Sequence, residues 1–144
     1  MKRYIKSAVD KDISGLDYDH ILDIADVTRD QDIIRELSKH ERPYVRALIA
    51  RNKNTPEAIR RELSYDPAAE VRQWVAVRTT DQDILARLSQ DSDEAVRWAV
   101  AMCTLTPDDI LHELTKDESS RVREAAEKNL REYSWIRNSR MRNG

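Results

Sequence analysis

Four arginines recur at regular intervals, and their side chains could bind either phosphate groups or carboxylates within the chain. Successive members lie 26, 25 and 26 residues apart, and each directly follows a valine: Arg46, Arg72, Arg97 and Arg123. A guanidinium group binds a phosphate or a carboxylate through two parallel hydrogen bonds. A column of such groups could therefore hold the backbone of a nucleic acid.

Aspartates recur in register with these arginines, which favours a structural role. An aspartate lies six residues before the arginine in three of the four copies: Asp66, Asp91 and Asp117. A phosphate-binding column does not require this spacing, whereas regular pairing of arginines with carboxylates does. We expect each arginine to be held by the aspartate of its own or a neighbouring repeat, and to stabilise the fold. Binding of phosphates by the same arginines is the alternative.

The other residues with reactive or metal-binding side chains form no recognisable catalytic or metal-binding set. The single cysteine, Cys103, excludes an internal disulfide, and its position on the inward side of a predicted helix favours a buried, unreactive thiol. The three histidines, His20, His40 and His112, are too far apart for a metal-binding spacing. Only two glycines occur, which excludes a glycine-rich phosphate-binding loop. We predict no catalytic residue, no metal and no cofactor.

The arginines belong to a longer pattern that occurs four times and predicts pairs of short helices. The copy at residues 63–76 reads LSYDPAAEVRQWVA. A pattern that recurs every 25–26 residues is typical of helical units that stack and bury a shared core. In three copies, the aspartate named above is expected to cap the second helix, and in the first copy His40, a poorer cap, takes its position. The first helix is expected to begin at a threonine N-cap, at Thr55, Thr80 and Thr106.

Apolar residues at helical spacing predict which faces are buried. Each first helix has an apolar pair four residues apart, such as Ile84 and Leu88, and so narrow a stripe must pack against neighbouring helices. In the second helices, the valine before each arginine and the positions three, four and seven residues later are expected to point inward. Trp74 and Ala99 occupy equivalent inward positions, so we expect them to compensate each other in volume.

The combined pattern, Thr-Pro-x6-Leu-Ser/Thr-x-Asp-x4-Val-Arg-x2-Val/Ala-Ala/Glu, resembles the leucine-rich repeat variant, which is related to the HEAT and armadillo repeats. The resemblance covers about residues 29–131. It implies a superhelix that alternates α- and 3₁₀-helices, and most often a protein-binding function. In one branch of HEAT-like proteins it implies DNA glycosylase activity. A founding member of the family carries an iron–sulfur cluster on N-terminal cysteines, which this chain lacks, so that property is not inferred.

We therefore predict an all-α fold: a right-handed α-solenoid of about four two-helix repeats of 25–26 residues, with terminal caps. Residues 1–28 are expected to form an N-terminal cap with a degenerate half repeat, residues 29–131 the four repeats, and residues 132–144 a C-terminal cap and basic tail. In the tail, Tyr133, Trp135 and Ile136 would cover the open end of the last repeat. Alternatively, the tail's arginines and aromatic rings would bind single-stranded nucleic acid.

The charge balance and the hydropathy of the chain limit the classes of protein to which it can belong. The 25 basic and 27 acidic residues nearly cancel, so the net charge predicts neither a nucleic-acid-binding nor a membrane protein. Their distribution is uneven, because residues 81–120 carry 3 basic and 10 acidic groups, whereas residues 121–144 carry 7 and 3. No apolar run is long enough to span a membrane, and the amino terminus lacks the pattern of a signal peptide. We expect a cytoplasmic protein.

The predicted binding site is a surface lined by the second helices. Trp98 lies two residues after a valine of the pattern, about 200° around the helix from it, and Met102 follows one turn later. An aromatic residue beside a flexible methionine is typical of an interface hot spot. Alternatively, Trp98 fills the groove between adjacent second helices. Neighbouring copies extend the row with Gln73, Val77, Arg51 and Lys128.

These observations predict a non-catalytic interaction module that binds a protein partner through the second-helix surface. The alternative is a nucleic-acid-binding protein that uses the recurring arginines and the basic tail. A DNA glycosylase-like enzyme is the third hypothesis. The sequence predicts neither the identity of the partner nor the oligomeric state.

Overall fold

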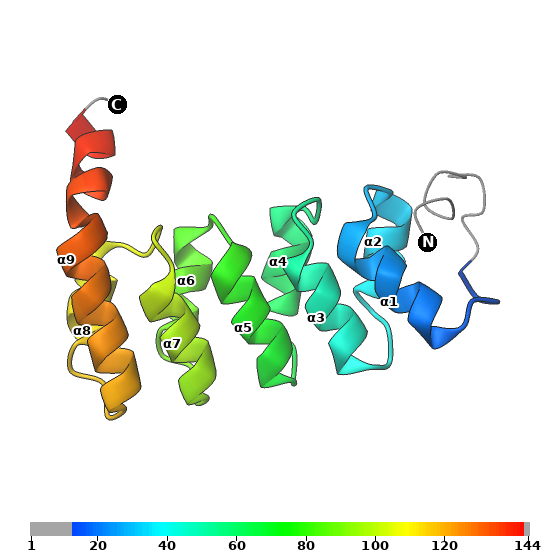
Figure 1. The fold of residues 1–144 in the computed structure, drawn as a ribbon, viewed down its shortest axis with the longest axis horizontal. Helices are drawn as coiled ribbons and strands as arrows, with labels where there is room; N and C mark the ends of the chain where they lie inside the picture. Colours follow the sequence, from blue (N-terminus) through cyan, green and yellow to red (C-terminus); the bar gives the residue numbers. More distant parts are fainter. Residues whose placement is uncertain (1–12, 143–144) are drawn as a thin grey trace.

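The computed structural model describes residues 13–142, and within that range every regular element is a helix (Figure 1). The all-α class predicted from the sequence is therefore confirmed. Both helices of each predicted pair are α-helical within the described range, so the alternation with 3₁₀-helices that the resemblance implied does not occur there. The predictions for residues 1–12 and 143–144 lie outside the described residues. The helices are α1 (Tyr18–Val27), α2 (Gln31–Leu37), α3 (Pro43–Arg51), α4 (Glu57–Leu63), α5 (Ala69–Arg78), α6 (Gln82–Leu88), α7 (Glu94–Met102), α8 (Asp108–Leu114) and α9 (Ser120–Arg142).

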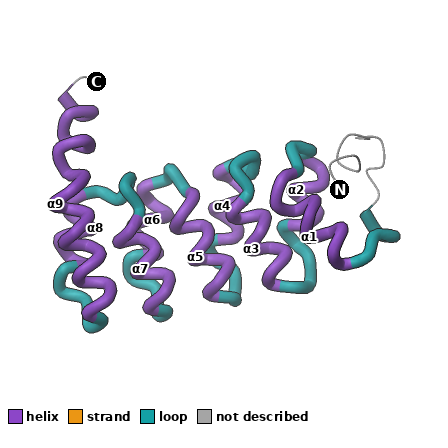
Figure 2. The backbone as a smooth tube through the Cα atoms, viewed as in Figure 1, coloured by secondary structure: helices purple, strands orange, loops and turns teal. Residues whose placement is uncertain are grey.

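The helices lie in two rows along the long axis of the molecule. Helices α1, α3, α5, α7 and α9 pack side by side and run in the same direction, from the lower to the upper side of Figure 1. We call them the parallel row. Helices α2, α4, α6 and α8 form the second row, and Figure 2 shows the short loops that join the two rows. The parallel row therefore has an N-terminal edge and a C-terminal edge, which carry different side chains.

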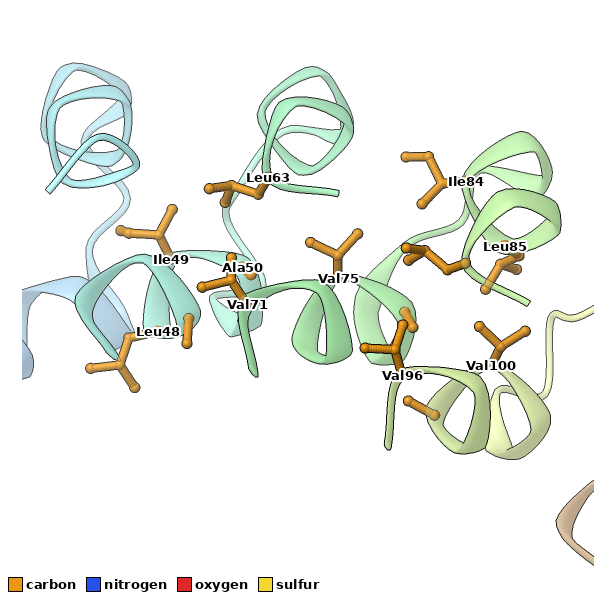
Figure 3. Packing of buried hydrophobic residues seen from close by; sticks show 14 of the residues in the cluster. Leu48, Ile49, Ala50, Leu63, Val71, Val75, Ile84, Leu85, Val96 and Val100 are labelled. Carbon is orange, nitrogen blue, oxygen red and sulfur yellow. The ribbon is translucent and has the colours of Figure 1, made fainter. Parts of the chain in front are cut away.

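The hydrophobic core lies between the two rows. The valine that precedes each recurring arginine is fully buried, as are Ile84 and Leu88 of α6. Figure 3 shows Val75 and Val100 of the parallel row facing apolar side chains of α4 and α6. Full burial of such a side chain stabilises the fold by about 1.5–3 kcal/mol. The apolar spacing seen in the sequence therefore identified the buried faces of most helices.

Two residues of the second helices that were expected in the core are only partly buried, as are Ile33 and Ile110 of the first helices. Trp74 packs against the core with part of its ring, while the rest lies beside Arg51, whose guanidinium carbon is 5.2 Å from the ring centroid. Trp74 is therefore a surface residue as well as a packing residue. Cys103 is half-buried because α7 ends at Met102 and the cysteine is its C-cap, outside the helical face on which the sequence placed it.

The predicted N-caps are displaced by one or two residues. Thr55 and Thr106 do not cap the helices that follow them, because their hydroxyl groups donate to the carbonyl oxygens of Ile49 at 2.6 Å and Val100 at 2.7 Å. These carbonyls belong to the last turns of α3 and α7, where intrahelical donors are missing. Thr80 is replaced as the cap of α6 by Asp81. The aspartates expected to cap the second helices stabilise the turns before those helices instead. Asp66, Asp91 and Asp117 each accept a hydrogen bond from the backbone N–H two residues later.

The C-terminal segment continues α9 and does not fold back over the last repeat. Helix α9 is 23 residues long, and in Figure 1 its end projects beyond the neighbouring helices. Trp135 is 65% exposed, so the expectation that it covers the open end is wrong. It lies two residues from Tyr133, about 200° around the helix, whereas Ile136 is on the same side as Tyr133. Tyr133 and Ile136 are both partly buried.

Candidate functional site

The recurring arginines form a column of ion pairs at the N-terminal edge. Arg72 donates from Nε and Nη2 to Asp91 at 2.8 and 3.0 Å, and Arg97 donates in the same way to Asp117 at 2.8 and 3.2 Å. Arg46 pairs with Asp66 at 2.6 and 3.0 Å. Each arginine thus holds the aspartate of the next repeat along the chain. We call these residues, with Arg123, the arginine–aspartate ladder.

Backbone carbonyl groups occupy the remaining face of each guanidinium. Nη1 of Arg72 donates to the carbonyls of Asp66 at 2.8 Å and Pro67 at 3.1 Å. Nη1 of Arg123 donates to the carbonyls of Asp117 and Glu118 at 2.7 and 3.0 Å. At Arg72 and Arg97, the aspartate of the same repeat therefore contributes its carbonyl, while the aspartate of the next repeat contributes its carboxylate. No ion pair joins Arg123 to a carboxylate within residues 13–142, where it is the last member of the ladder.

The ladder shifts the protonation equilibria of its own members. Burial raises the pKa of Asp91 and Asp117, but the hydrogen bonds from Arg72 and Arg97 and from nearby backbone N–H groups lower it more, so that the pKa of each lies below its ordinary value. The hydrogen bond to the carboxylate raises the pKa of Arg97, against the opposing effect of burial. Both partners are therefore charged at neutral pH. The side chains of the three ladder arginines that have a carboxylate partner, Arg46, Arg72 and Arg97, are only 10–15% exposed, which leaves little of them for an external phosphate.

The C-terminal edge carries the exposed apolar residues of the predicted binding surface. Val77 is 44% exposed at the end of α5, and Met102 is 45% exposed at the end of α7, the helix that packs beside it. Leu105, in the loop after α7, is 37% exposed. Figure 1 shows the ends of α5 and α7 on the same side of the molecule. The structure therefore brings Val77 and Met102 together on one edge and adds Leu105, which the sequence interpretation did not include.

The other predicted binding residues have different surroundings. Trp98 packs partly against the core, and the guanidinium carbon of Arg121 lies 4.2 Å from its ring centroid, so its ring is not an open apolar surface. Gln73 is partly buried. Arg51 is not a free cation, because Asp26 accepts from its Nε at 3.0 Å and its Nη2 at 2.6 Å. Lys128, on α9, is exposed.

A groove of about 610 Å³ opens beside the apolar residues, between the C-terminal ends of α1, α3 and α5. Four basic side chains and one acidic side chain line it, together with an aromatic ring, two asparagines and a valine. Its lining residues are Asp26, Val27, Arg29, Arg51, Asn52, Lys53, Asn54, Trp74 and Arg78. The sequence interpretation included only Arg51 of this set in the binding surface.

Two buried asparagines fasten the ends of the parallel helices to each other. The side-chain amide of Asn52 donates to the carbonyls of Ala25 and Thr28, both at 3.0 Å. The amide of Asn129 donates to the carbonyls of Ala101 at 2.8 Å and Cys103 at 2.9 Å. Both asparagines lie seven residues after the valine of their repeat, so this position could have been found by aligning the copies. They satisfy carbonyl groups that helix C-termini leave without an intrahelical donor.

Comparison of the chain with models of protein families, with curated proteins and with solved structures gave no match. The candidate site must therefore be judged by its geometry. Within residues 13–142, no three side chains of histidine, cysteine, aspartate or glutamate lie together as a metal-binding group. In the same range, no helix combines the length and the apolar character needed to cross a membrane.

Proposed function

We propose that this protein is a non-catalytic α-solenoid of four helical repeats, with terminal caps, that binds a protein partner along its C-terminal edge. The observation that carries the proposal is the alignment of exposed apolar side chains at the ends of neighbouring helices. Val77 and Met102 occupy equivalent positions, six residues after the valine of their repeat, and Leu105 follows in the next loop. Single exposed apolar residues are common, whereas neighbouring ones support an interaction site.

The repeat assignment is supported by the recurrence of the same contacts. Asp66, Asp91 and Asp117 each bind the arginine of the preceding copy through equivalent atoms. Such recurrence is expected when identical units stack with a constant displacement. The handedness and superhelical form that we propose come from the resemblance to the leucine-rich repeat variant.

The arginine–aspartate ladder weighs against a nucleic-acid backbone as its ligand. A phosphate that approached Arg97 would have to displace Asp117 from a pair that is about 90% buried. Separating this pair would leave the Asp117 carboxylate without its charged partner, at a cost of about 1–3 kcal/mol. The ladder therefore fits a structural role better than a binding role.

A photo-crosslinking experiment tests the proposed function. A benzophenone amino acid replaces Met102 in one variant and Ala86, an exposed residue of α6, in the control variant. In extract from the source organism, we expect the Met102 variant to form a protein adduct that the Ala86 variant does not form. The adducted protein is then purified and titrated with the wild-type chain and with the Val77→Glu and Met102→Glu variants.

We expect each glutamate substitution to weaken binding at least tenfold while leaving the midpoint of thermal unfolding unchanged. An adduct that nuclease removes would contradict the proposal, because the ligand would then be a nucleic acid. A purified partner that binds both glutamate variants as tightly as the wild type would also contradict it.

A further inference from the structure

The groove at the C-terminal edge contains cationic side chains that form no ion pair with any acidic residue in the described part of the chain. Arg29, Lys53 and Arg78 line it and are exposed. None of the three forms an ion pair with a carboxylate within residues 13–142. Among the described residues that line the groove, Asp26 alone is acidic, and it forms an ion pair with Arg51 at 2.6 Å. At neutral pH the groove therefore carries three positive charges in excess.

Hydrogen bonds and core packing fix the positions of the residues that lie between these cations. Asn52 and Asn54 both donate to the carbonyl of Thr28, at 3.0 and 3.2 Å, so the loop after α3 is fastened to the loop after α1. Trp74 closes the groove on the α5 side, with part of its ring packed against the core. The groove thus combines a rigid amide and aromatic wall with cations on its rim. Such a site can bind anionic side chains without first being ordered.

The basic character ends where the apolar residues begin. Along the C-terminal edge, the groove at the ends of α1, α3 and α5 is followed by Val77, Met102 and Leu105. Beyond α5 this edge carries carboxylates, because the N-terminal ends of α6 and α8, which follow the ends of α5 and α7, contain Asp81, Asp83, Asp108 and Asp109. A polynucleotide carries a uniform negative charge and would meet favourable potential over only part of this edge. A peptide with carboxylates at one end and apolar side chains at the other would be complementary along the whole of it.

We propose that the C-terminal edge binds an extended acidic–apolar segment of a partner protein. The carboxylates of the segment contact Arg29, Lys53 and Arg78, and its apolar side chains contact Val77 and Met102. This inference rests on the proposed function and specifies the chemistry of the partner. Packed helices lie about 8–10 Å apart, so the edge from α1 to α7 is about 24–30 Å long. At about 3.3 Å per residue, a segment of roughly eight residues covers it.

The test uses a fluorescein-labelled peptide, Glu-Glu-Glu-Glu-Ser-Leu-Ser-Leu, and fluorescence anisotropy at low salt. The groove variant carries Arg29→Gln, Lys53→Gln and Arg78→Gln. The matched control carries Arg35→Gln, Lys39→Gln and Arg131→Gln, which remove the same charge from exposed positions that do not line the groove. We expect the groove variant to bind the peptide at least tenfold more weakly than the wild type, and the control to differ less than twofold. Neither variant should unfold at a lower temperature, because none of these six side chains forms an ion pair in residues 13–142.

Three results would overturn the inference. The first is absence of peptide binding to the wild type at millimolar concentration. The second is equal weakening by the groove variant and the control, which would indicate a general effect of net charge. The third is tighter binding of a labelled oligo-dT of eight nucleotides than of the peptide, with that binding lost in the groove variant, which would identify a nucleic-acid site.

The partner found by crosslinking separates this inference from the proposed function. If Met102→Glu weakens binding of that partner and the groove variant does not, the interaction module stands and the acidic segment is wrong. If the groove variant and Met102→Glu both leave binding unchanged, the C-terminal edge is not the interaction surface and both proposals fail.

Discussion

The ladder arginines at the N-terminal edge and the exposed groove arginines at the C-terminal edge have different partners. At the N-terminal edge, Arg46, Arg72 and Arg97 each hold a carboxylate and two carbonyl groups, and little of each side chain is exposed. At the C-terminal edge, Arg29 and Arg78 are exposed and have no carboxylate partner in residues 13–142. Residue type alone therefore does not separate a structural arginine from a binding arginine. The presence of an acidic partner in register does.

The direction of the helices explains why charges divide in this way. Helix N-termini carry a partial positive charge and favour carboxylates, whereas helix C-termini carry a partial negative charge and favour cations. Asp91 and Asp117 lie just before α7 and α9, at the N-terminal edge. Arg78 lies in the last turn of α5, where the helix itself stabilises its charge. A cation at the C-terminal edge can therefore stay without a carboxylate partner at little cost in stability.

A substitution in the core beneath both edges is expected to have the largest effect on the free energy of unfolding. Leu88 is 1% exposed, and Leu88→Ala should lower the free energy of unfolding by about 2–5 kcal/mol through lost burial and the cavity left behind. Urea denaturation measures the loss. The control is Leu105→Ala at the C-terminal edge, where we expect a change within about 0.5 kcal/mol. Equal losses at the two positions would contradict the assignment of Leu105 to the surface.

A substitution in the ladder at the N-terminal edge should have the second largest effect on the free energy of unfolding. Arg97→Ala removes the donor for Asp117 and for two carbonyls, and should lower the free energy of unfolding by about 1–3 kcal/mol. Urea denaturation of this variant is compared with that of Arg123→Ala, which breaks hydrogen bonds to carbonyls but no carboxylate pair in the described part of the chain. A larger loss in Arg123→Ala than in Arg97→Ala would be inconsistent with stabilisation by the carboxylate pairs.

The pH dependence of stability should also come from the N-terminal edge. Because the folded-state pKa of Asp91 and Asp117 is lowered, their stabilisation is fully present above the ordinary aspartate value of 3.8, and is lost as the pH falls through the folded pKa below it. Thermal unfolding followed between pH 2 and pH 6 measures this dependence. The Asp91→Asn, Asp117→Asn variant should be less stable at pH 6 and show a flatter decline below pH 4. A decline as steep as that of the wild type would show that other carboxylates dominate.

The smallest effect on stability is expected at the C-terminal edge. Arg78→Ala removes an exposed side chain with no ion pair in residues 13–142, and should change the free energy of unfolding by less than about 0.5 kcal/mol. The same variant should bind the acidic–apolar peptide several-fold more weakly. A stability loss as large as that of Arg97→Ala would remove the difference between the two edges.

The N-terminal edge was largely predictable from the sequence, and the C-terminal edge was not. The ladder repeats in register, so the spacing of Asp91 and Arg97 was sufficient to predict their involvement in pairing. The apolar period likewise located Val96 and Leu88 in the core. These features are shared by successive repeats, and sequence periodicity detects what is shared.

The groove depends on residues that differ from one repeat to the next. Arg78 occupies the position that Asn52 and Asn129 hold in other copies, and Lys53 lies in a loop beyond the helical pattern. Trp74 was assigned to the core because its helical phase is inward, yet a side chain of its size also reaches the surface beside Arg51. Asn129 is a polar residue at a position with inward helical phase, yet it is 3% exposed and satisfies two carbonyls. The roles of these residues depend on which side chains lie near them in the structure, and their spacing in the sequence does not define those neighbours.

Arginine footprinting tests the difference between the edges most directly. The free protein and its complex with the crosslinked partner are treated briefly with phenylglyoxal, and modification at each arginine is quantified by mass spectrometry. We expect Arg29 and Arg78 to react in the free protein and to be protected in the complex, while Arg72 and Arg97 react slowly in both. Ladder arginines that react readily in the free protein and become protected in the complex would contradict the assignment of binding to the C-terminal edge.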